Sequence, residues 1–261
     1  MVKLIAVDMD GTFLNSKKEY DVEMFERLYN EMQDKNIIFM VASGNQYEQI
    51  SSFFDKEKNM NIIFASENGA LIKHKDDEIY HNIIDNTIYE NTLKLIEEYE
   101  ELYTGVSTLS GCYVKPHNEL YDSYKFYFPL IHQVDNLHNL KDVLKLSLNA
   151  PKGKTDYYVD LINSRIDPSL HAINCGEDSL DIISKGITKA NAINIICKMN
   201  NITLDDCACF GDSDNDLEMI KACKYSYAMS NGLDSIKSIA YEIIQSNDEN
   251  AVLNKIEEII K

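Results

Sequence analysis

The sequence predicts an α/β fold in which a doubly wound, Rossmann-like parallel sheet carries an inserted α+β module. Short apolar runs of strand length end abruptly in polar turns, and amphipathic helical segments follow those turns. This alternation stops after about residue 80, gives way to a mixed series of segments, and resumes near residue 189. We therefore expect a core formed by residues 1–82 and 185–261, with residues 83–184 inserted between its halves.

The first half of the core is expected to alternate buried strands with helices. In chain order the elements are a strand at residues 3–7, a helix at 22–33, a strand at 37–42, a helix at 47–56 and a strand at 62–65. The first helix is assigned from apolar residues near helical spacing, namely Met24, Phe25, Leu28 and Met32. Each strand runs into a polar turn, and parallel strands place such turns at one edge of the sheet.

The inserted segment has a different character, because helical and alternating patterns follow one another irregularly. A long acidic helix is expected at residues 87–102, and strand-like alternation follows at 111–116 and 123–128. The mixed series of helices and strands continues at residues 140–148, 155–166, 170–174 and 180–183. The insert is therefore expected to be an α+β module.

In the second half of the core, helices and buried strands alternate again. Its expected elements are a helix at residues 189–199, a strand at 207–210, a helix ending at 222, a strand at 225–228, a short helix, a strand at 241–244 and a helix at 251–260. The common doubly wound strand order 3-2-1-4-5-6 places the first strand beside the fourth. Asp8 follows the first strand and Asp212 the fourth, so we expect them to lie together where such sheets bind ligands.

The composition narrows the classes of partner. A formal net charge of −18 repels polyanions, which argues against nucleic acids and anionic membranes. Arg27 and Arg165 are the only arginines, so a metal ion and lysines are the expected anion binders. The six cysteines form no CxxC pair, and no apolar stretch approaches the ~18 residues of a membrane span. We expect a cytoplasmic protein with reduced thiols that is a monomer or a weak homo-oligomer.

Four carboxylates are candidates for a metal site at the predicted sheet edge. Asp8 and Asp10 leave the first strand on alternate positions, and Gly11 permits a tight turn after them. Asp212 and Asp216 are four residues apart at the start of a helix. Such an oxygen-rich set suits a hard cation such as Mg²⁺. Turn formation by Asp8 and Asp10, and helix capping by Asp212 or Asp216, are the alternative interpretations.

Three further residues have the chemistry of a phosphate site. Lys189 follows Thr188, a suitable N-cap, and its cation in the first helical turn opposes the helix dipole, which hints at a function. Ser43 and Gly44 offer a hydroxyl and accessible backbone N–H groups after the second strand. An ordinary surface lysine and an ordinary turn are the alternatives.

The segment Asp8-Met9-Asp10-Gly11-Thr12 after an N-terminal strand resembles the first motif of the haloacid dehalogenase superfamily of phosphohydrolases. Ser43, Lys189 and the run from Gly211 to Asp216 resemble its second, third and fourth motifs in the right order. The similarity extends over the whole chain to the Cof-type group, whose members carry a large α/β cap between the second and third motifs. The inserted module is thus expected to be a cap that sets substrate specificity.

The resemblance implies a Mg²⁺-dependent phosphatase acting on a small phosphorylated metabolite: a sugar phosphate, a nucleotide or a phosphorylated cofactor. Asp8 would be the nucleophile that forms an aspartyl-phosphate, and Asp10 the general acid and base. The implied metal ligands are Asp8, Asp10 (through its carbonyl), Asp212 and Asp216. The implied phosphate-binding residues are Met9, Ser43, Gly44, Lys189 and Asn215.

Two other functions remain open, and a few positions depart from the family pattern. A phosphomutase would use the same aspartyl-phosphate and return the phosphoryl group to substrate, whereas a regulatory phosphate-binding module would not turn over. Asn45 stands where the family often has Arg, and Ala190 and Ala251 replace frequent glycines. In the cap, Lys115, His117 and Tyr127 are candidates for contacting the substrate.

Overall fold

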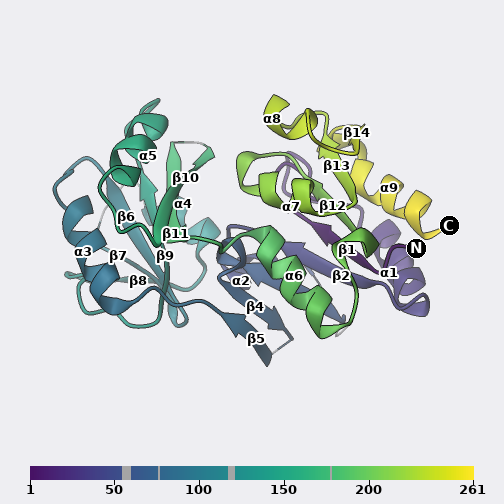
Figure 1. Ribbon diagram of the computed structural model, residues 1–261, viewed down its shortest axis with the longest axis horizontal. Coiled ribbons are helices and arrows are strands. Elements are labelled where there is room, and N and C mark those ends of the chain that lie inside the picture. The colour runs from purple at the N-terminus through teal and green to yellow at the C-terminus, as the bar shows by residue number, and fades with distance from the viewer. Residues whose placement is uncertain (55–59, 76, 117–120, 177) are drawn as a thin grey trace.

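The computed structural model describes residues 1–54, 60–75, 77–116, 121–176 and 178–261, which form two sheets lying side by side (Figure 1). The strands of the first sheet are β1 (Leu4–Val7), β2 (Ile38–Ala42), β3 (Ile62–Ser66), β4 (Leu71–His74), β5 (Asp77–His81), β12 (Cys207–Gly211), β13 (Tyr225–Met229) and β14 (Glu242–Ile244). Their order in the sheet is β14-β13-β12-β1-β2-β3-β4-β5. The predicted order of the six parallel strands is confirmed, and β1 pairs with both β2 and β12.

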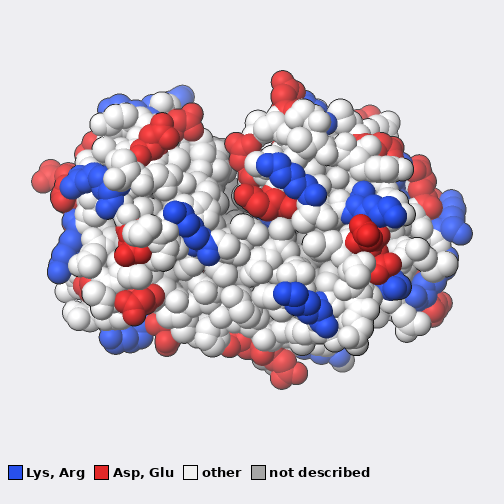
Figure 2. Space-filling model, viewed as in Figure 1, with Lys and Arg blue, Asp and Glu red and all other residues white. Residues whose placement is uncertain are grey.

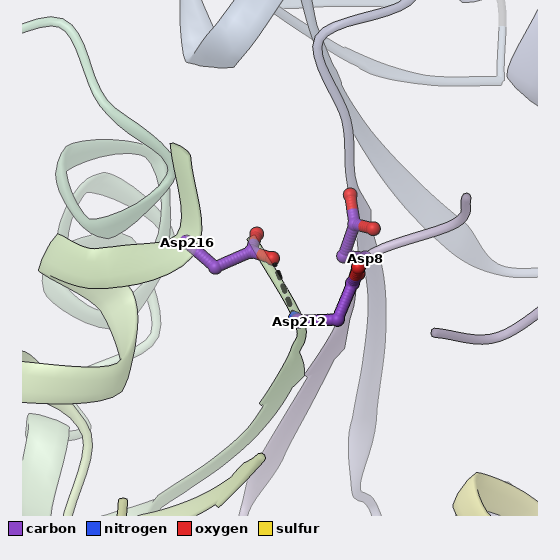
Figure 3. Close-up of side chains that lie close together, drawn as sticks. All are labelled: Asp8, Asp212 and Asp216. Atoms are coloured by element: carbon purple, nitrogen blue, oxygen red, sulfur yellow. Dashed lines mark hydrogen bonds between the residues drawn. The ribbon is translucent and has the colours of Figure 1, made fainter. Parts of the chain in front are cut away.

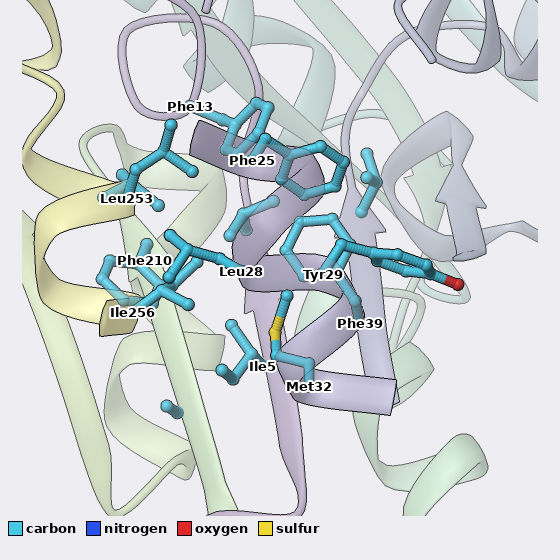
Figure 4. Close-up of a cluster of buried hydrophobic side chains, with 14 of the residues drawn as sticks. Ile5, Phe13, Phe25, Leu28, Tyr29, Met32, Phe39, Phe210, Leu253 and Ile256 are labelled. Carbon is cyan, nitrogen blue, oxygen red and sulfur yellow. The ribbon is translucent and has the colours of Figure 1, made fainter. Parts of the chain in front are cut away.

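Helices cover both faces of this sheet. One face packs on α1 (Val22–Asp34), α2 (Tyr47–Ser52) and α9 (Ala251–Ile260), and the other on α6 (Lys189–Met199), α7 (Leu217–Ala222) and α8 (Asp234–Lys237). Figure 4 shows the first of these cores, where Phe25 and Leu28 of α1 and Ile256 of α9 meet Ile5 and Phe210 of the sheet. Neighbouring residues of each central strand alternate between the two cores, as strands buried on both sides require.

The second sheet comes from the inserted segment. Its strands are β6 (Tyr103–Thr108), β7 (Gly111–Val114), β8 (Ile131–Gln133), β9 (Val143–Asn149), β10 (Leu170–Gly176) and β11 (Ser179–Ser184), in the order β10-β11-β9-β6-β7-β8. The helices of this segment are α3 (Asn86–Ile96), α4 (Tyr121–Tyr127) and α5 (Thr155–Asn163). An apolar core lies between one face of the sheet and α3 and α5. The fold class is thus confirmed, whereas the boundaries at residues 83 and 184 stay a prediction.

The structure corrects two elements expected in the insert. Residues 123–128 belong to helix α4 and its end, not to a strand. Residues four apart lie on the same side of a helix, and there Tyr124 and Phe128 stack with ring centroids 5.4 Å apart. The helix expected at residues 87–102 ends at Ile96. The acidic run that follows, Glu97 to Glu101, is unfavourable at the negative end of a helix dipole.

The sequence also missed the antiparallel strands β4 and β5, which extend the first sheet beyond β3. The helix expected at residues 47–56 ends at Ser52, and Asp55 and Lys56 lie outside the described residues. Five of the six free cysteines are buried and Cys175 is exposed. Within the described ranges, no helix combines the length and the apolar character that crossing a bilayer requires.

Candidate active site

Three carboxylates converge where β1 and β12 end at the same edge of the first sheet (Figure 3). Asp8 follows β1, and Asp212 follows β12. Val7 pairs with Phe210 in the parallel register, so the two strands end side by side. Asp216 closes a 3-10 turn (Asp214–Asp216) directly before α7. Oxygen atoms of the three side chains lie within 4.8 Å of one another. The predicted strand order therefore brings these residues together although they are distant in sequence.

Lys189 lies among these carboxylates and is 1% exposed. Thr188 caps its helix as expected, with its hydroxyl accepting from Asn191 N at 3.1 Å. The Lys189 Nζ donates to Asp8 Oδ1 and Asp216 Oδ1, each at 2.6 Å, and to Asn215 Oδ1 at 3.2 Å. Burial alone would lower the pKa of Lys189, but the charges of Asp216 and Asp8 outweigh it and raise this pKa. The lysine is therefore held as a cation inside the site.

The set Asp8, Lys189, Asp212 and Asp216, which we call the Lys189 cluster, carries more negative than positive groups. Burial raises the pKa of Asp8 well above its ordinary value, with Lys189 opposing this rise. Burial and then the charge of Asp216 raise the pKa of Asp212 to about 6. Three carboxylates face one ammonium group, so two negative charges remain when all are ionised. A divalent cation would neutralise them, and an all-oxygen ligand set suits such an ion.

The residues that follow Asp10 hold Asp212 in place. Thr12 donates its hydroxyl to Asp212 Oδ1 at 2.7 Å. Gly11 has a φ of +77°, and a Cβ atom there would lie 2.7 Å from Asp212 Oδ2. The backbone can approach this carboxylate only because the residue is glycine. One oxygen each of Asp8 and Asp212 has no hydrogen-bond donor among the described residues, so both can reach a cation.

Asp216 is fully buried, and both of its oxygens have donors. Oδ1 accepts from Lys189, while Oδ2 accepts from the main-chain N–H groups of Asp212 at 2.9 Å and Ser213 at 3.2 Å. The expected capping role is therefore present, in a capping box with Ser213. Asp216 orients Lys189 and Asp212, and its own oxygens are less accessible to an ion than those of Asp8.

Asp10 does not join the other three carboxylates. Its Oδ1 accepts from Lys18 Nζ at 2.6 Å, and its Oδ2 accepts from Asn45 Nδ2 at 2.7 Å. The four-carboxylate cluster expected from sequence is thus a cluster of three side chains. The unusual Asn45 serves as a partner of Asp10, a contact that the sequence pattern did not reveal.

Ser43 and Gly44 follow β2, which lies next to β1 in parallel register. Ser43 is buried, and its hydroxyl accepts from Asn45 N at 3.1 Å. Met9 is also fully buried, so only its backbone can face a ligand. We refer to residues 43–45 as the 43–45 loop. Since Val41 pairs with Val7, this loop lies beside Asp8 at the ends of the two strands.

A pocket of about 170 Å³ opens beside Lys189 between the two sheets. Its lining includes Asn68, His171, Asn174, Asp214, Asn215 and Glu218. Figure 2 shows a hollow between the two parts of the molecule with acidic groups on its right side. Two buried polar atoms of lining residues, Asn68 Oδ1 and His171 Nδ1, have no hydrogen-bond partner within the described residues.

Of the cap residues suggested from sequence, Lys115 and Tyr127 are not among the residues that line this pocket. Lys115 is exposed and pairs with Glu97 at 2.7 Å. Tyr127 is half-buried at the end of α4, and His117 lies outside the described residues. His171 and Asn174 of β10, which line the pocket, were not singled out, because the sequence alone does not place β10 near Lys189.

Known hydrolases and phosphatases are similar to this chain in sequence and fold. The family model described as haloacid dehalogenase-like hydrolase matches residues 5–256. The Escherichia coli (strain K12) 5-amino-6-(5-phospho-D-ribitylamino)uracil phosphatase YbjI is 30% identical over 100% of this chain and 97% of its own. Phosphatase YwpJ of Bacillus subtilis (strain 168) is 28% identical over 99% of this chain and 100% of its own. The crystal structure of SMU.1108c from Streptococcus mutans UA159 superposes with a TM-score of 0.94 and 33% identity, covering 100% of this chain and 99% of that one.

Proposed function

Since the chain belongs to the haloacid dehalogenase-like hydrolases and is a phosphoric monoester hydrolase, we propose that it is a Mg²⁺-dependent phosphatase of a small phosphorylated metabolite, acting through an aspartyl-phosphate. The observation that carries the proposal is the position of Asp8. Its carboxylate lies at the carboxyl end of β1, with one oxygen held 2.6 Å from Lys189 Nζ and the other without a donor among the described residues. That second oxygen is the nucleophile.

Asp8 and Lys189 perform the first step together. Asp8 attacks phosphorus, and the bond from phosphorus to the leaving oxygen breaks. Lys189, Asn215, Ser43 and the main-chain N–H groups near Met9 and Gly44 bind the phosphoryl oxygens. Catalysis of this kind rests on positioning and on stabilising spread negative charge. The buried ammonium group of Lys189 supplies a fixed positive charge where that charge develops.

Asp10 transfers the protons. Its carboxyl group gives a proton to the leaving oxygen and then accepts one from the water that attacks the aspartyl-phosphate. Lys18 and Asn45 hold this carboxyl group at the open side of the cluster, where it is partly exposed. It can therefore meet both the leaving group and incoming water. The water attacks phosphorus, the bond to Asp8 breaks, and phosphate is released.

The carboxylates of Asp8 and Asp212 and the main-chain carbonyl of Asp10 would hold the metal. Asp216 supports this set by fixing the Asp212 main chain. When bound, Mg²⁺ neutralises charge on the phosphoryl group. The two excess negative charges of the Lys189 cluster support the assignment to a divalent ion, and the oxygen ligands support magnesium.

The pocket beside Lys189 is the proposed place of the leaving group. Its lining carboxylates, Asp214 and Glu218, suit hydroxyl and amine donors and repel a second anionic group. A phosphorylated polyol or sugar fits this description. The substrate named for the Escherichia coli relative, 5-amino-6-(5-phospho-D-ribitylamino)uracil, has a ribityl chain and is therefore the first compound to test.

The experiment is a phosphate-release screen with the purified protein. The panel contains that compound, sugar phosphates, nucleoside monophosphates and phosphorylated cofactors, each with Mg²⁺ and with EDTA. We expect Mg²⁺-dependent release from at least one polyol or sugar monophosphate. No release from any member would contradict the phosphatase assignment, and release that needs a bisphosphate activator would instead indicate a phosphomutase.

The intermediate has its own test. Acid quenching during turnover of ³²P-labelled substrate should leave label on the protein, and hydroxylamine should remove it, as it removes acyl phosphates. Asp8→Asn should abolish this labelling. Turnover without any protein-bound label in rapid-quench samples would argue for direct attack by water.

A further inference from the structure

The second sheet presents a polar, buried face to the first part of the molecule. Ser107, Lys145, Ser147 and Asp181 lie on this face and are at most 4% exposed. The alternate residues Leu146, Leu148 and Ile182 point the opposite way, into the apolar core with α3 and α5. Burying charge at an internal face is costly unless the charges are paired, so these groups need specific partners.

Lys145 pairs with Asp181 of the same face, and the partners across the interface come from two turns of the core. Lys145 Nζ donates to Gly44 O at 2.7 Å and to Asp181 Oδ2 at 2.8 Å, and it lies 3.2 Å from Glu67 Oε2. Asp181 also accepts from Asn68 Nδ2 at 2.8 Å and from Ser147 Oγ at 2.7 Å. We call Glu67, Asn68, Lys145, Ser147 and Asp181 the Lys145 cluster.

Two irregular backbone features bring this cluster together. A register shift between β6 and β9 leaves Leu144 as an extra residue, since Lys145 pairs with Ser107 and Val143 with Thr108. Leu144 and Lys145 thereby both reach the core, Leu144 packing near Leu71 and Ile187. On the core side, Glu67 and Asn68 have positive φ angles of 51° and 57°. Such strain in residues other than glycine persists only where surrounding contacts enforce it.

The contact with Gly44 acts on the proposed phosphate site. A planar trans peptide points its C=O and N–H in opposite directions, so fixing Gly44 O also fixes the N–H of Asn45. This N–H donates to Ser43 Oγ at 3.1 Å. Ser43 Oγ thus already accepts a hydrogen bond from the main chain, and the Ser43 O–H can donate to a phosphate oxygen. Asn45 meanwhile holds Asp10 through its side chain at 2.7 Å.

From these contacts we infer that Lys145 is a positioning residue, which couples docking of the inserted sheet to the geometry of the 43–45 loop. The inference rests on the proposed function, because it assigns the loop to phosphate binding. When the polar face of the second sheet docks, Lys145 sets the Gly44 peptide plane, and the Ser43 hydroxyl takes its phosphate-binding direction. When the sheet moves away, water solvates the polar face and the loop loses this restraint.

The test compares Lys145→Met with the wild-type protein on p-nitrophenyl phosphate, with orthovanadate as an inhibitor that probes the phosphate site alone. Loss of one charge-assisted hydrogen bond is expected to lower kcat and weaken vanadate inhibition by about tenfold each. The Mg²⁺ concentration for half-maximal activity should stay within about twofold, since the Lys189 cluster is untouched. Lys141→Met, which removes an exposed lysine of the inserted segment that donates to Asn86 Oδ1 at 3.4 Å, is the matched control and should behave as wild type.

A second variant keeps the test decisive if Lys145→Met does not fold. Lys145→Met leaves two buried carboxylates without a cation, so Lys145→Met combined with Glu67→Gln and Asp181→Asn gives a neutral cluster without the contact to Gly44. A folded variant of either kind with wild-type kcat and vanadate inhibition would overturn the inference. So would a parallel tenfold rise in the Mg²⁺ requirement, which indicates a general loss of structure. Failure of the proposed function is distinct, because the wild-type protein would then show no Mg²⁺-dependent turnover.

Discussion

Lys189 and Lys145 are both almost fully buried, and each lies between two carboxylates. Lys189 contacts Asp8 and Asp216, both at 2.6 Å, whereas Lys145 contacts Asp181 at 2.8 Å and Glu67 at 3.2 Å. The surroundings differ. With all carboxylates ionised, Lys145 with Glu67 and Asp181 leaves one excess negative charge, and burial raises the pKa of Glu67. The Lys189 cluster has Asp212 as a third carboxylate and oxygens without donors among the described residues.

This difference distinguishes a ligand-binding site from a structural contact between the two sheets. A buried lysine with two acids is by itself a structural ion pair. An additional buried carboxylate costs free energy unless a cation or a proton compensates it. The larger excess charge of the Lys189 cluster and its oxygens without donors among the described residues therefore indicate a ligand. In the Lys145 cluster Asp181 accepts from three donors, which indicates a fixed contact between the two sheets.

The largest expected effect is on stability. Lys189→Met and Lys145→Met each leave buried carboxylates without their cation, which should lower the free energy of unfolding by about 3–5 kcal/mol. Saturating Mg²⁺ should stabilise Lys189→Met more than the wild-type protein, because the ion also replaces the missing cation beside the same carboxylates. Lys145→Met keeps the Lys189 cluster and should gain only as much as the wild-type protein gains. Thermal melting of both variants, with Mg²⁺ and with EDTA, measures the difference. Equal responses of the two variants to Mg²⁺ would remove the distinction between the clusters.

The second prediction concerns the acid that pairs with each lysine. Asp8→Asn removes the nucleophile and should lower kcat by at least about a hundredfold with the fold intact. Asp181→Asn keeps an oxygen that accepts from Lys145, so its kcat should fall by no more than about tenfold. Steady-state kinetics on one substrate give both values. Near-normal activity of Asp8→Asn would exclude the proposed mechanism.

The residues of the two clusters were not equally predictable from the sequence. Asp8 and Asp212 could be placed together because the common strand order of a doubly wound sheet puts their strands side by side, and Lys189 because Thr188 marks the start of its helix. Lys145 and Asp181 could not be found in this way. Their meeting depends on the register of β9 and β11 and on the extra residue Leu144, and neither follows from apolar periodicity.

Local patterns also limited what the sequence could reveal about the insert. Residues 123–128 alternate like a strand, yet the stacking of Tyr124 on Phe128 belongs to a helix. Within the first motif, Gly11 was expected to permit a turn, but its close approach to Asp212 and the bond from Thr12 appear only in three dimensions. The sequence thus predicts the parallel core and its acids well, and the contacts between segments poorly.

The pH dependence of metal binding gives the third prediction. The pKa of Asp212 is raised to about 6 without metal, so the folded protein keeps this proton to a higher pH than the unfolded chain does. Ionising Asp212 therefore weakens the metal-free fold as pH rises towards 6, and protons compete with the ion below 6. The Mg²⁺ concentration that half-saturates the thermal shift should be at least about tenfold higher at pH 5 than at pH 7.5. An unchanged midpoint would mean that Asp212 does not bind the ion.

The smallest expected effect comes from a matched pair of hydroxyl groups. Thr12 donates to Asp212 Oδ1 and Ser147 donates to Asp181 Oδ1, both at 2.7 Å. Thr12→Val removes a hydrogen bond worth about 1 kcal/mol, which should raise the half-activating Mg²⁺ concentration about fivefold because Asp212 is less well oriented. Ser147→Ala removes an equivalent bond in the Lys145 cluster and should leave that concentration unchanged. Titrating Mg²⁺ against activity in both variants decides the point. A similar shift in both would show that the metal requirement follows overall stability, whereas a shift in Thr12→Val alone assigns metal binding to the Lys189 cluster.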